Sequence, residues 1–192
     1  MKPLGSTDQK RLNREWRRRT GGRVALLLDD VQAPYNVGAI IRTAAAFRVE
    51  RLYLCGATPA PGHPKAARTA LGTERLVPWE AVPDVQVAVA AAHASGLAVV
   101  GLELAGGAVP LPEAAWASGG ACFAFGHEQR GLSPACLAGC DIVAYVPTPG
   151  KVGSLNVAAA VAVALYEARR REWATPTGPE APQHPPPGRW TT

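Results

Sequence analysis

The chain has 192 residues, which is enough for one domain with a substantial core and leaves little for a second. Its residues are 47% hydrophobic and 18% charged, as in a globular protein, and no apolar run is long enough to cross a bilayer. The net charge is +5, and 16 of the 20 basic residues are arginine, whose planar fork binds phosphate bidentately, so we expect a nucleic-acid partner.

The first 23 residues form a basic amino-terminal extension. They lack the hydrophobic core of a signal peptide, and we therefore expect a cytoplasmic protein. Residues 8–23 crowd basic side chains around Trp16. Two interpretations stay open for this segment: a solvated helix, or an arm that grips RNA phosphates while Trp16 stacks on a base.

Apolar runs and helical patterns alternate along residues 24–173. Strands are predicted at residues 24–28, 51–54, 97–102, 121–125 and 141–146, with a brief strand at 76–77. Helices are predicted at 36–45, 85–94, 134–137 and from 154 onward, and residues 56–72 read as irregular. This alternation indicates an α/β domain with a mainly parallel sheet flanked by helices. Residues 174–192 are rich in proline and are predicted to be a disordered tail.

Four cysteines raise the question of a metal site. Cys136 and Cys140 form a C-x3-C pair, whereas Cys55 and Cys122 lie in apolar runs and offer no second paired motif. We favour buried, reduced thiols over a zinc site, and we expect no metal.

Three polar stretches, residues 36–42, 126–130 and 150–156, each follow the end of a predicted strand. Ligands of parallel sheets collect outside the carboxyl ends of the strands, so we expect the three stretches to converge. Asn36 and Ser154 suit helix N-caps, because each side chain can accept from a free backbone N–H.

The first stretch also carries a glycine and an arginine. Gly38 lets another chain or a ligand approach the first helical turn. Arg42 lies about 140° around the helix from Val37, away from the apolar stripe.

Each polar residue of these stretches, taken alone, is also typical of an ordinary surface. The usual nucleotide signatures are missing, because no G-x-G-x-x-G follows a strand. Gly150 and Lys151 resemble the end of a P-loop, but Tyr145 occupies the position of its first glycine and Val152 replaces the Ser or Thr that binds Mg²⁺.

The combination NVGAIIRTA, FGHEQRGL and VPTPGKVGSLNVAAAVAVALYE resembles the three motifs of the SpoU/TrmH branch of the SPOUT methyltransferases. These are RNA ribose 2′-O-methyltransferases that use S-adenosylmethionine, and the resemblance covers about residues 24–171. It implies a carboxy-terminal trefoil knot, which sequence rules would have argued against. It also implies a homodimer packed partly through the last helix, with the site completed across the interface.

The resemblance further implies roles for particular residues. The methyl donor would be contacted largely by backbone around Leu102, Gly126, Val146 and Leu155. The family's functional positions fall on Asn36, Arg42, Glu128, Ser154 and Asn156. We expect Arg42 to grip a phosphate and orient the ribose, because a guanidinium is not deprotonated in a protein. Whether Glu128, water or Arg42 itself takes the proton stays open.

We therefore expect an S-adenosylmethionine-dependent 2′-O-methyltransferase of a structured RNA, and we favour tRNA over rRNA because the chain is compact. The 2′-OH is present only in RNA, so this chemistry restricts the substrate class. No folded RNA-binding domain precedes Val24, so we expect RNA capture by the basic extension, by loop residues such as Arg68 and by the dimer surface. Two alternatives are a non-catalytic RNA-binding or dimerisation protein of this fold, and a SPOUT enzyme that methylates a base nitrogen.

Overall fold

The structure, a computed structural model, describes residues 3–117 and 119–174. Its centre is a seven-stranded sheet in the order β3-β2-β1-β6-β4-β7-β5, and neighbouring strands are parallel. The predicted α/β class with a mainly parallel sheet is confirmed. The strands are β1 (Val24–Asp29), β2 (Arg51–Cys55), β3 (Trp79–Val82), β4 (Ala98–Leu102), β5 (Val109–Pro110), β6 (Ala121–Gly126) and β7 (Ile142–Tyr145).

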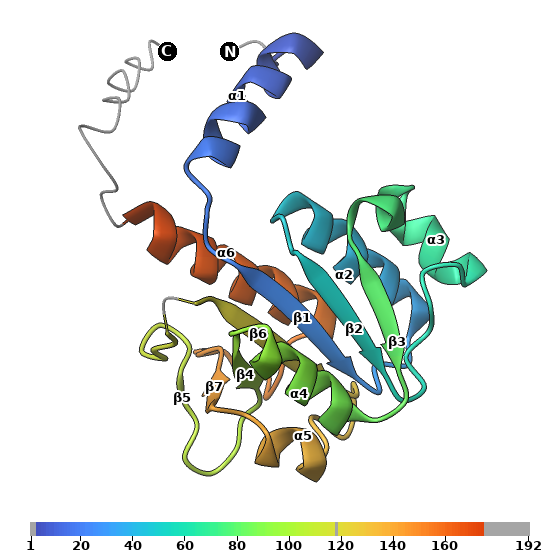
Figure 1. Cartoon of the computed structure of the whole chain (residues 1–192), viewed down its shortest axis with the longest axis vertical. Coiled ribbons are helices and arrows are strands. Elements are labelled where there is room, and N and C mark those ends of the chain that lie inside the picture. Colours follow the sequence, from blue (N-terminus) through green and yellow to red (C-terminus); the bar gives the residue numbers. More distant parts are fainter. Residues whose placement is uncertain (1–2, 118, 175–192) are drawn as a thin grey trace.

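Helices cover both faces of this sheet (Figure 1). One face is covered by α2 (Pro34–Ala46) and α6 (Val157–Ala174), and the other by α4 (Val85–Ala94) and α5 (Pro134–Ala138). Two shorter elements, α3 (Pro64–Ala70) and η1 (Thr73–Leu76), pack on α2. The first helix, α1 (Ser6–Arg18), stands away from the sheet. The expected tail lies outside the described residues, except for Ala174, which ends α6.

β1 lies inside the sheet and is buried on both faces. Leu26 and Leu28 belong to the core under α2 and α6, whereas Ala25 and Leu27 belong to the core under α4 and α5. A fully buried leucine contributes roughly 1.5–3 kcal/mol relative to an exposed one. Because β1 has helices on both sides, its side chains must be apolar on both faces, which gives a continuous apolar run. This run was the basis for predicting the strand.

Two predictions between β2 and α4 are wrong. Residues 56–72 are not wholly irregular, because they contain α3, and the next strand begins at Trp79 instead of at residues 76–77. His63 starts α3, since its Nδ1 accepts from Lys65 N–H at 3.2 Å and Pro64 occupies the first turn. Seven residues without an apolar periodicity left no pattern from which to predict this helix.

α6 has two apolar faces instead of one. Ala159, Val163 and Tyr166 form a second stripe that faces solvent, with Val163 41% and Tyr166 54% exposed. The predicted stripe is buried against the chain's own sheet and consists of Val157, Val161, Leu165 and Ala168.

The four cysteines belong to the core layer under α4 and α5, with Cys140 at its margin, and all are free thiols. Burial raises the pKa of Cys55 to about 12, so this thiol stays protonated. Across residues 3–117 and 119–174, no group of three or more His, Cys, Asp or Glu side chains is arranged to hold a metal ion. None of the helices in this part of the chain is long and apolar enough to cross a membrane.

Gly38 fixes the position of α3 against α2. A Cβ at this position would lie 2.0 Å from Thr69 Oγ1 and 2.1 Å from the backbone oxygen of Ala66. The expected close approach at Gly38 is therefore made by another segment of the same chain.

Gly38→Ala should lower the free energy of unfolding by about 1–3 kcal/mol, because overpacking against backbone outweighs the better helix propensity of alanine. Gly62→Ala is the matched control, since a Cβ there meets nothing within 4 Å. Urea denaturation of both variants checks this prediction, and equal stabilities would contradict it.

Candidate active site

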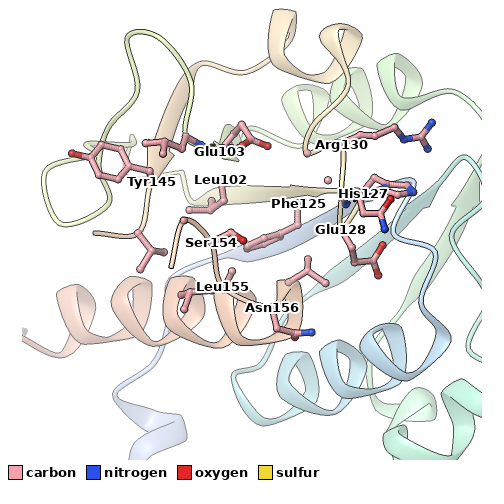
Figure 2. Close-up of a pocket in the computed structure, with 18 of the residues that line it drawn as sticks. Leu102, Glu103, Phe125, His127, Glu128, Arg130, Tyr145, Ser154, Leu155 and Asn156 are labelled. Carbon is pink, nitrogen blue, oxygen red and sulfur yellow. Dashed lines mark hydrogen bonds between the residues drawn. The ribbon is translucent and has the colours of Figure 1, made fainter. Parts of the chain in front are cut away.

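A pocket of about 740 Å³ opens at the carboxyl ends of β4, β6 and β7 (Figure 2). Its walls combine apolar side chains with polar and charged ones from the loops that follow the strands, among them Glu103, His127 and Arg130. Glu128, Ser154 and Asn156 lie at its rim. The apolar lining residues are Leu102, Leu104, Phe125, Val146, Leu155, Val157 and Ala160.

The three polar stretches meet beside this pocket, as predicted. Asn36 Nδ2 donates to Glu128 Oε1 at 2.9 Å, and Asn156 Nδ2 donates to Asn36 Oδ1 at 3.0 Å. These two bonds join α2, the loop after β6 and the start of α6. We call Asn36, Glu128 and Asn156 the polar triad below.

Glu128 also receives the free backbone donors at the start of α2. Ala33 N–H donates to Oε1 at 3.0 Å, and Gln32 N–H donates to Oε2 at 3.2 Å. Burial alone would raise the pKa of Glu128, but the hydrogen bonds from Asn36, Ala33 and Gln32 outweigh it, so the pKa lies below its ordinary value. Both oxygens of Glu128 are thus engaged as acceptors, so the side chain is suited to holding the neighbouring segments in place. Its low pKa makes it a weak base.

Both predicted helix caps are wrong, for a common reason. α2 begins at Pro34, and the side chain of Asn36 is used by Glu128 and Asn156 instead of capping its own helix. α6 begins at Val157, and its cap is Asn156, whose Oδ1 accepts from Ala158 N–H at 2.9 Å. Ser154 lies exposed at the pocket rim, two residues before that cap.

The loop after β6 is a tight turn closed by two backbone bonds between His127 and Gly131, of 3.0 and 2.8 Å. A Cβ on Gly126 would lie 2.1 Å from the backbone carbon of Gly131, and Gly131 itself has φ of +68°. Both glycines are therefore required by the turn, whatever the pocket binds.

Several acidic residues that brace this turn were missed in the sequence. Glu103 accepts from Leu132 N–H and Leu104 N–H, each at 3.0 Å. Asp29 accepts from Ser133 N–H at 2.7 Å, and Asp30 forms an ion pair with Arg130. The sequence did contain a common feature of these residues, because each lies at the end of a buried strand or directly after it, at the carboxyl edge of the sheet, where loops need acceptors.

Arg42 is the one predicted site residue that this chain leaves apart from the others. It is exposed on α2 and does not line the pocket. Arg42 lies six residues after Asn36, which turns it about 120° away around the helix axis. By contrast, the pocket is lined by all four residues expected around the methyl donor: Leu102, Gly126, Val146 and Leu155.

Comparisons with known proteins bear on the family and on the fold. The model of the SpoU rRNA Methylase family matches residues 23–166. The 23S rRNA (guanosine-2′-O-)-methyltransferase RlmB of Acinetobacter baylyi is 35% identical over 147 residues, which are 76% of this chain and 59% of the relative.

Two solved structures have the same fold. The AdoMet-bound rRNA methyltransferase from Sinorhizobium meliloti has a TM-score of 0.73 at 31% identity, covering 80% of this chain and 58% of that one. A structure that bears on the 2-OH methylation of C/U34 on tRNA has a TM-score of 0.65 at 34% identity, covering 78% and 96%. The chain therefore spans less than two thirds of the Acinetobacter and Sinorhizobium proteins, and nearly all of the third.

Glu128→Gln should lower the free energy of unfolding by about 1–2 kcal/mol at pH 7, because one acceptor of the polar triad becomes a donor. The ordinary pKa is 4.5 and the folded-state pKa is lower, so the carboxylate stabilises the fold above about pH 4.5. That contribution is lost as the pH falls through the folded-state pKa. The difference between wild type and variant should therefore narrow in acid.

Urea denaturation from pH 7 down to pH 3.5 measures that difference. Glu113→Gln is the control, since this exposed carboxylate has no side-chain partner among the described residues. A difference that widens in acid, or a control that behaves like Glu128→Gln, would contradict the assignment.

Proposed function

Since the chain belongs to the SpoU rRNA Methylase family, we propose that it is an S-adenosylmethionine-dependent methyltransferase that modifies the ribose 2′-OH of a structured RNA. The observation that carries this proposal is the polar triad at the rim of a pocket with apolar and polar walls, at the carboxyl edge of a parallel sheet. A cytoplasmic location follows from the RNA substrate and agrees with four free thiols.

The pocket fits the methyl donor in size and character. Its volume of about 740 Å³ lies within the range of about 300–1,000 Å³ that small-molecule sites occupy. Leu102, at the end of β4, and Val146 and Leu155, at the two ends of the loop between β7 and α6, would hold the donor, with the backbone beside Gly126 completing the wall. When bound, S-adenosylmethionine supplies an electrophilic methyl group.

The chain's own polar residues would position the reacting groups. Glu128 and Asn36 hold the loop after β6 against α2, and Asn156 fixes the start of α6 at the same point. The hydroxyl of Ser154 has no hydrogen-bond partner among the described residues, and it would contact the ribose or the donor. Orienting the 2′-OH in line with the methyl group can contribute up to about 7–11 kcal/mol to the lowering of the barrier.

Arg42 would act on the RNA from a second subunit. Its side chain is exposed and lies away from the pocket of its own chain. A partner subunit that brings its Arg42 to this pocket would supply a cation for the neighbouring phosphate and for the developing alkoxide. The exposed stripe of Ala159, Val163 and Tyr166 on α6 is the surface that such a homodimer would bury.

The RNA substrate is either tRNA or rRNA. The name of the Acinetobacter relative specifies 23S rRNA. The solved structure that is covered over 96% of its own length concerns tRNA. The preference for tRNA stays a prediction. It rests on the compactness of the chain, and the match to 96% of the structure that concerns tRNA supports it.

The family resemblance also leads us to propose that the carboxy-terminal part of the chain is knotted. Residues 146–156 and α6 would pass through a loop formed by the preceding strands. Single-molecule stretching checks this, because a knotted chain stays shorter when extended than its number of residues allows.

Methyl transfer from labelled S-adenosylmethionine to separate tRNA and rRNA pools, followed by nucleoside mass spectrometry, tests the reaction. We expect a 2′-O-methylated nucleoside with wild type, and at least about 100-fold less of it with Arg42→Ala. S-adenosylmethionine affinity should be nearly unchanged in that variant, since Arg42 does not line the pocket. A methyl group on a base nitrogen would establish the alternative enzyme. Absence of both transfer and cofactor binding would establish a non-catalytic RNA-binding protein.

Mixing two inactive variants tests whether Arg42 acts across the dimer. Ser154→Trp should fill the pocket of its own subunit and abolish cofactor binding while leaving Arg42 intact. After subunit exchange with Arg42→Ala, about a quarter of the sites would combine an intact pocket with an intact arginine, and activity should return to that level. Continued inactivity of a mixture that contains heterodimers would show that Arg42 acts within its own chain.

A further inference from the structure

The positive charge of this protein is concentrated at its amino terminus. Residues 1–23 hold eight basic and two acidic residues, a net charge of +6, whereas residues 24–192 hold twelve basic and thirteen acidic residues, a net charge of −1. The body that carries the pocket is thus close to neutral. Attraction of a polyanion over more than a few ångströms must come from the amino-terminal segment.

α1 arranges these charges on a single face. At 100° per residue, five cations fall within about 120° of the helix circumference, and Leu12 and Trp16 lie on the opposite side. α1 has no buried residue, and its cations form no ion pair with the carboxylates of residues 3–117 and 119–174. We call these cations the basic face of α1: Lys10, Arg11, Arg14, Arg17 and Arg18.

Repulsion between the like charges of the basic face destabilises α1. Arg14 has like charges three and four residues away in both directions, and such pairs destabilise an isolated helix. A helix of 13 residues is also marginal in water on its own. A partner with closely spaced negative charges would remove this repulsion.

The carboxyl-terminal end of α1 is nevertheless held firmly to the body. The rings of Trp16 and Trp173 lie 4.8 Å apart, and Trp173 Nε1 donates to Thr20 Oγ1 at 3.0 Å. Arg48 donates to the carbonyl oxygens of Arg17 and Thr20, at 3.1 and 2.6 Å, around the carboxyl-terminal end of the helix.

A second group of contacts secures the linker that follows. Glu172 accepts from the backbone N–H groups of Gly21 and Gly22. The buried Arg169 donates to the carbonyl oxygens of Gly22, Phe47 and Arg48. The end of α6 therefore fixes the position of α1, which stands away from the sheet (Figure 1).

These contacts correct one expectation from the sequence. Trp16 is not available to stack on a base, because one side of its ring packs on Trp173 and the guanidinium of Arg19 lies 4.5 Å from its centroid. The tryptophan anchors the helix, and the basic face on the other side of α1 remains exposed.

We propose that the basic face of α1 is a docking surface for the phosphate backbone of RNA, held at a fixed orientation by the contact between Trp16 and Trp173. This surface binds the phosphate backbone and does not recognise the base sequence. It therefore provides affinity for RNA, whereas the methyl transfer takes place at the pocket in the near-neutral part of the chain. This inference rests on the proposed RNA substrate, which makes RNA the polyanion expected at an amphipathic helix of this charge.

Binding of fluorescently labelled bulk tRNA to the full chain, measured as a function of salt, tests the surface without requiring methyl transfer. Arg11→Gln/Arg14→Gln should weaken binding roughly tenfold or more at 0.1 M salt and reduce the slope of log affinity against log salt by roughly 1–2. Arg51→Gln/Arg75→Gln is the matched control, since it removes the same charge from two exposed sites on the body. It should change the slope far less.

The anchor is tested by changing Trp16 without changing any charge. Trp16→Ala should weaken tRNA binding several-fold while leaving S-adenosylmethionine affinity unchanged, and Trp16→Phe should restore much of the loss. Equal effects of the two charge variants, or no effect of Trp16→Ala, would overturn the proposal. Binding of wild type to phosphatidylserine vesicles but not to tRNA would also overturn it.

These outcomes are separate from those that test the methyltransferase. Loss of tRNA binding in Arg11→Gln/Arg14→Gln supports the docking surface even where no RNA becomes methylated. Full tRNA binding by that variant, in a protein that methylates RNA, overturns the docking surface and leaves the proposed function intact.

Discussion

The arrangement of the site depends on one carboxylate that satisfies donors from distant parts of the chain. Glu128 accepts from the backbone of Gln32 and Ala33 and from the side chain of Asn36, all more than 90 residues away in sequence. Asn36 in turn accepts from Asn156, which caps α6. Helix starts leave backbone donors unpaired, and these bonds satisfy them at both α2 and α6. The same bonds hold together the rim of the pocket.

The pocket for the proposed methyl transfer and the cations for RNA binding lie on different parts of the molecule. The pocket is lined by both apolar and polar residues, and it lies in a part of the chain whose net charge is close to zero. The cations that would attract RNA lie on α1, and Arg42 lies exposed on α2. The pocket itself carries Glu103, Glu128 and Arg130. The cations that we propose for RNA lie outside it, on α1 and on Arg42 of a second subunit.

The sequence predicted the parts of the fold that depend on local pattern. Buried apolar runs such as that of β1 identified the central strands, and the helix at residues 85–94 was predicted with its observed bounds. The predicted convergence of the three polar stretches was correct because parallel strands bring their carboxyl ends to one edge. The caps were wrong because Asn36 and Ser154 were judged from their immediate neighbours, whereas Asn36 bonds to residues 92 and 120 positions away.

By itself, the amino-acid sequence determined the α/β class, the location of the site at the carboxyl edge and the family, since apolar periodicity and three ordered motifs are local features. Only the tertiary structure decided which residues are engaged in contacts within the chain and which remain exposed. Glu128 is engaged by backbone donors, Trp16 by Trp173, and Gly38 by α3, whereas Arg42 and the basic face of α1 remain exposed. Contacts between residues far apart in sequence carry no local pattern, so they become visible only when the chain is folded.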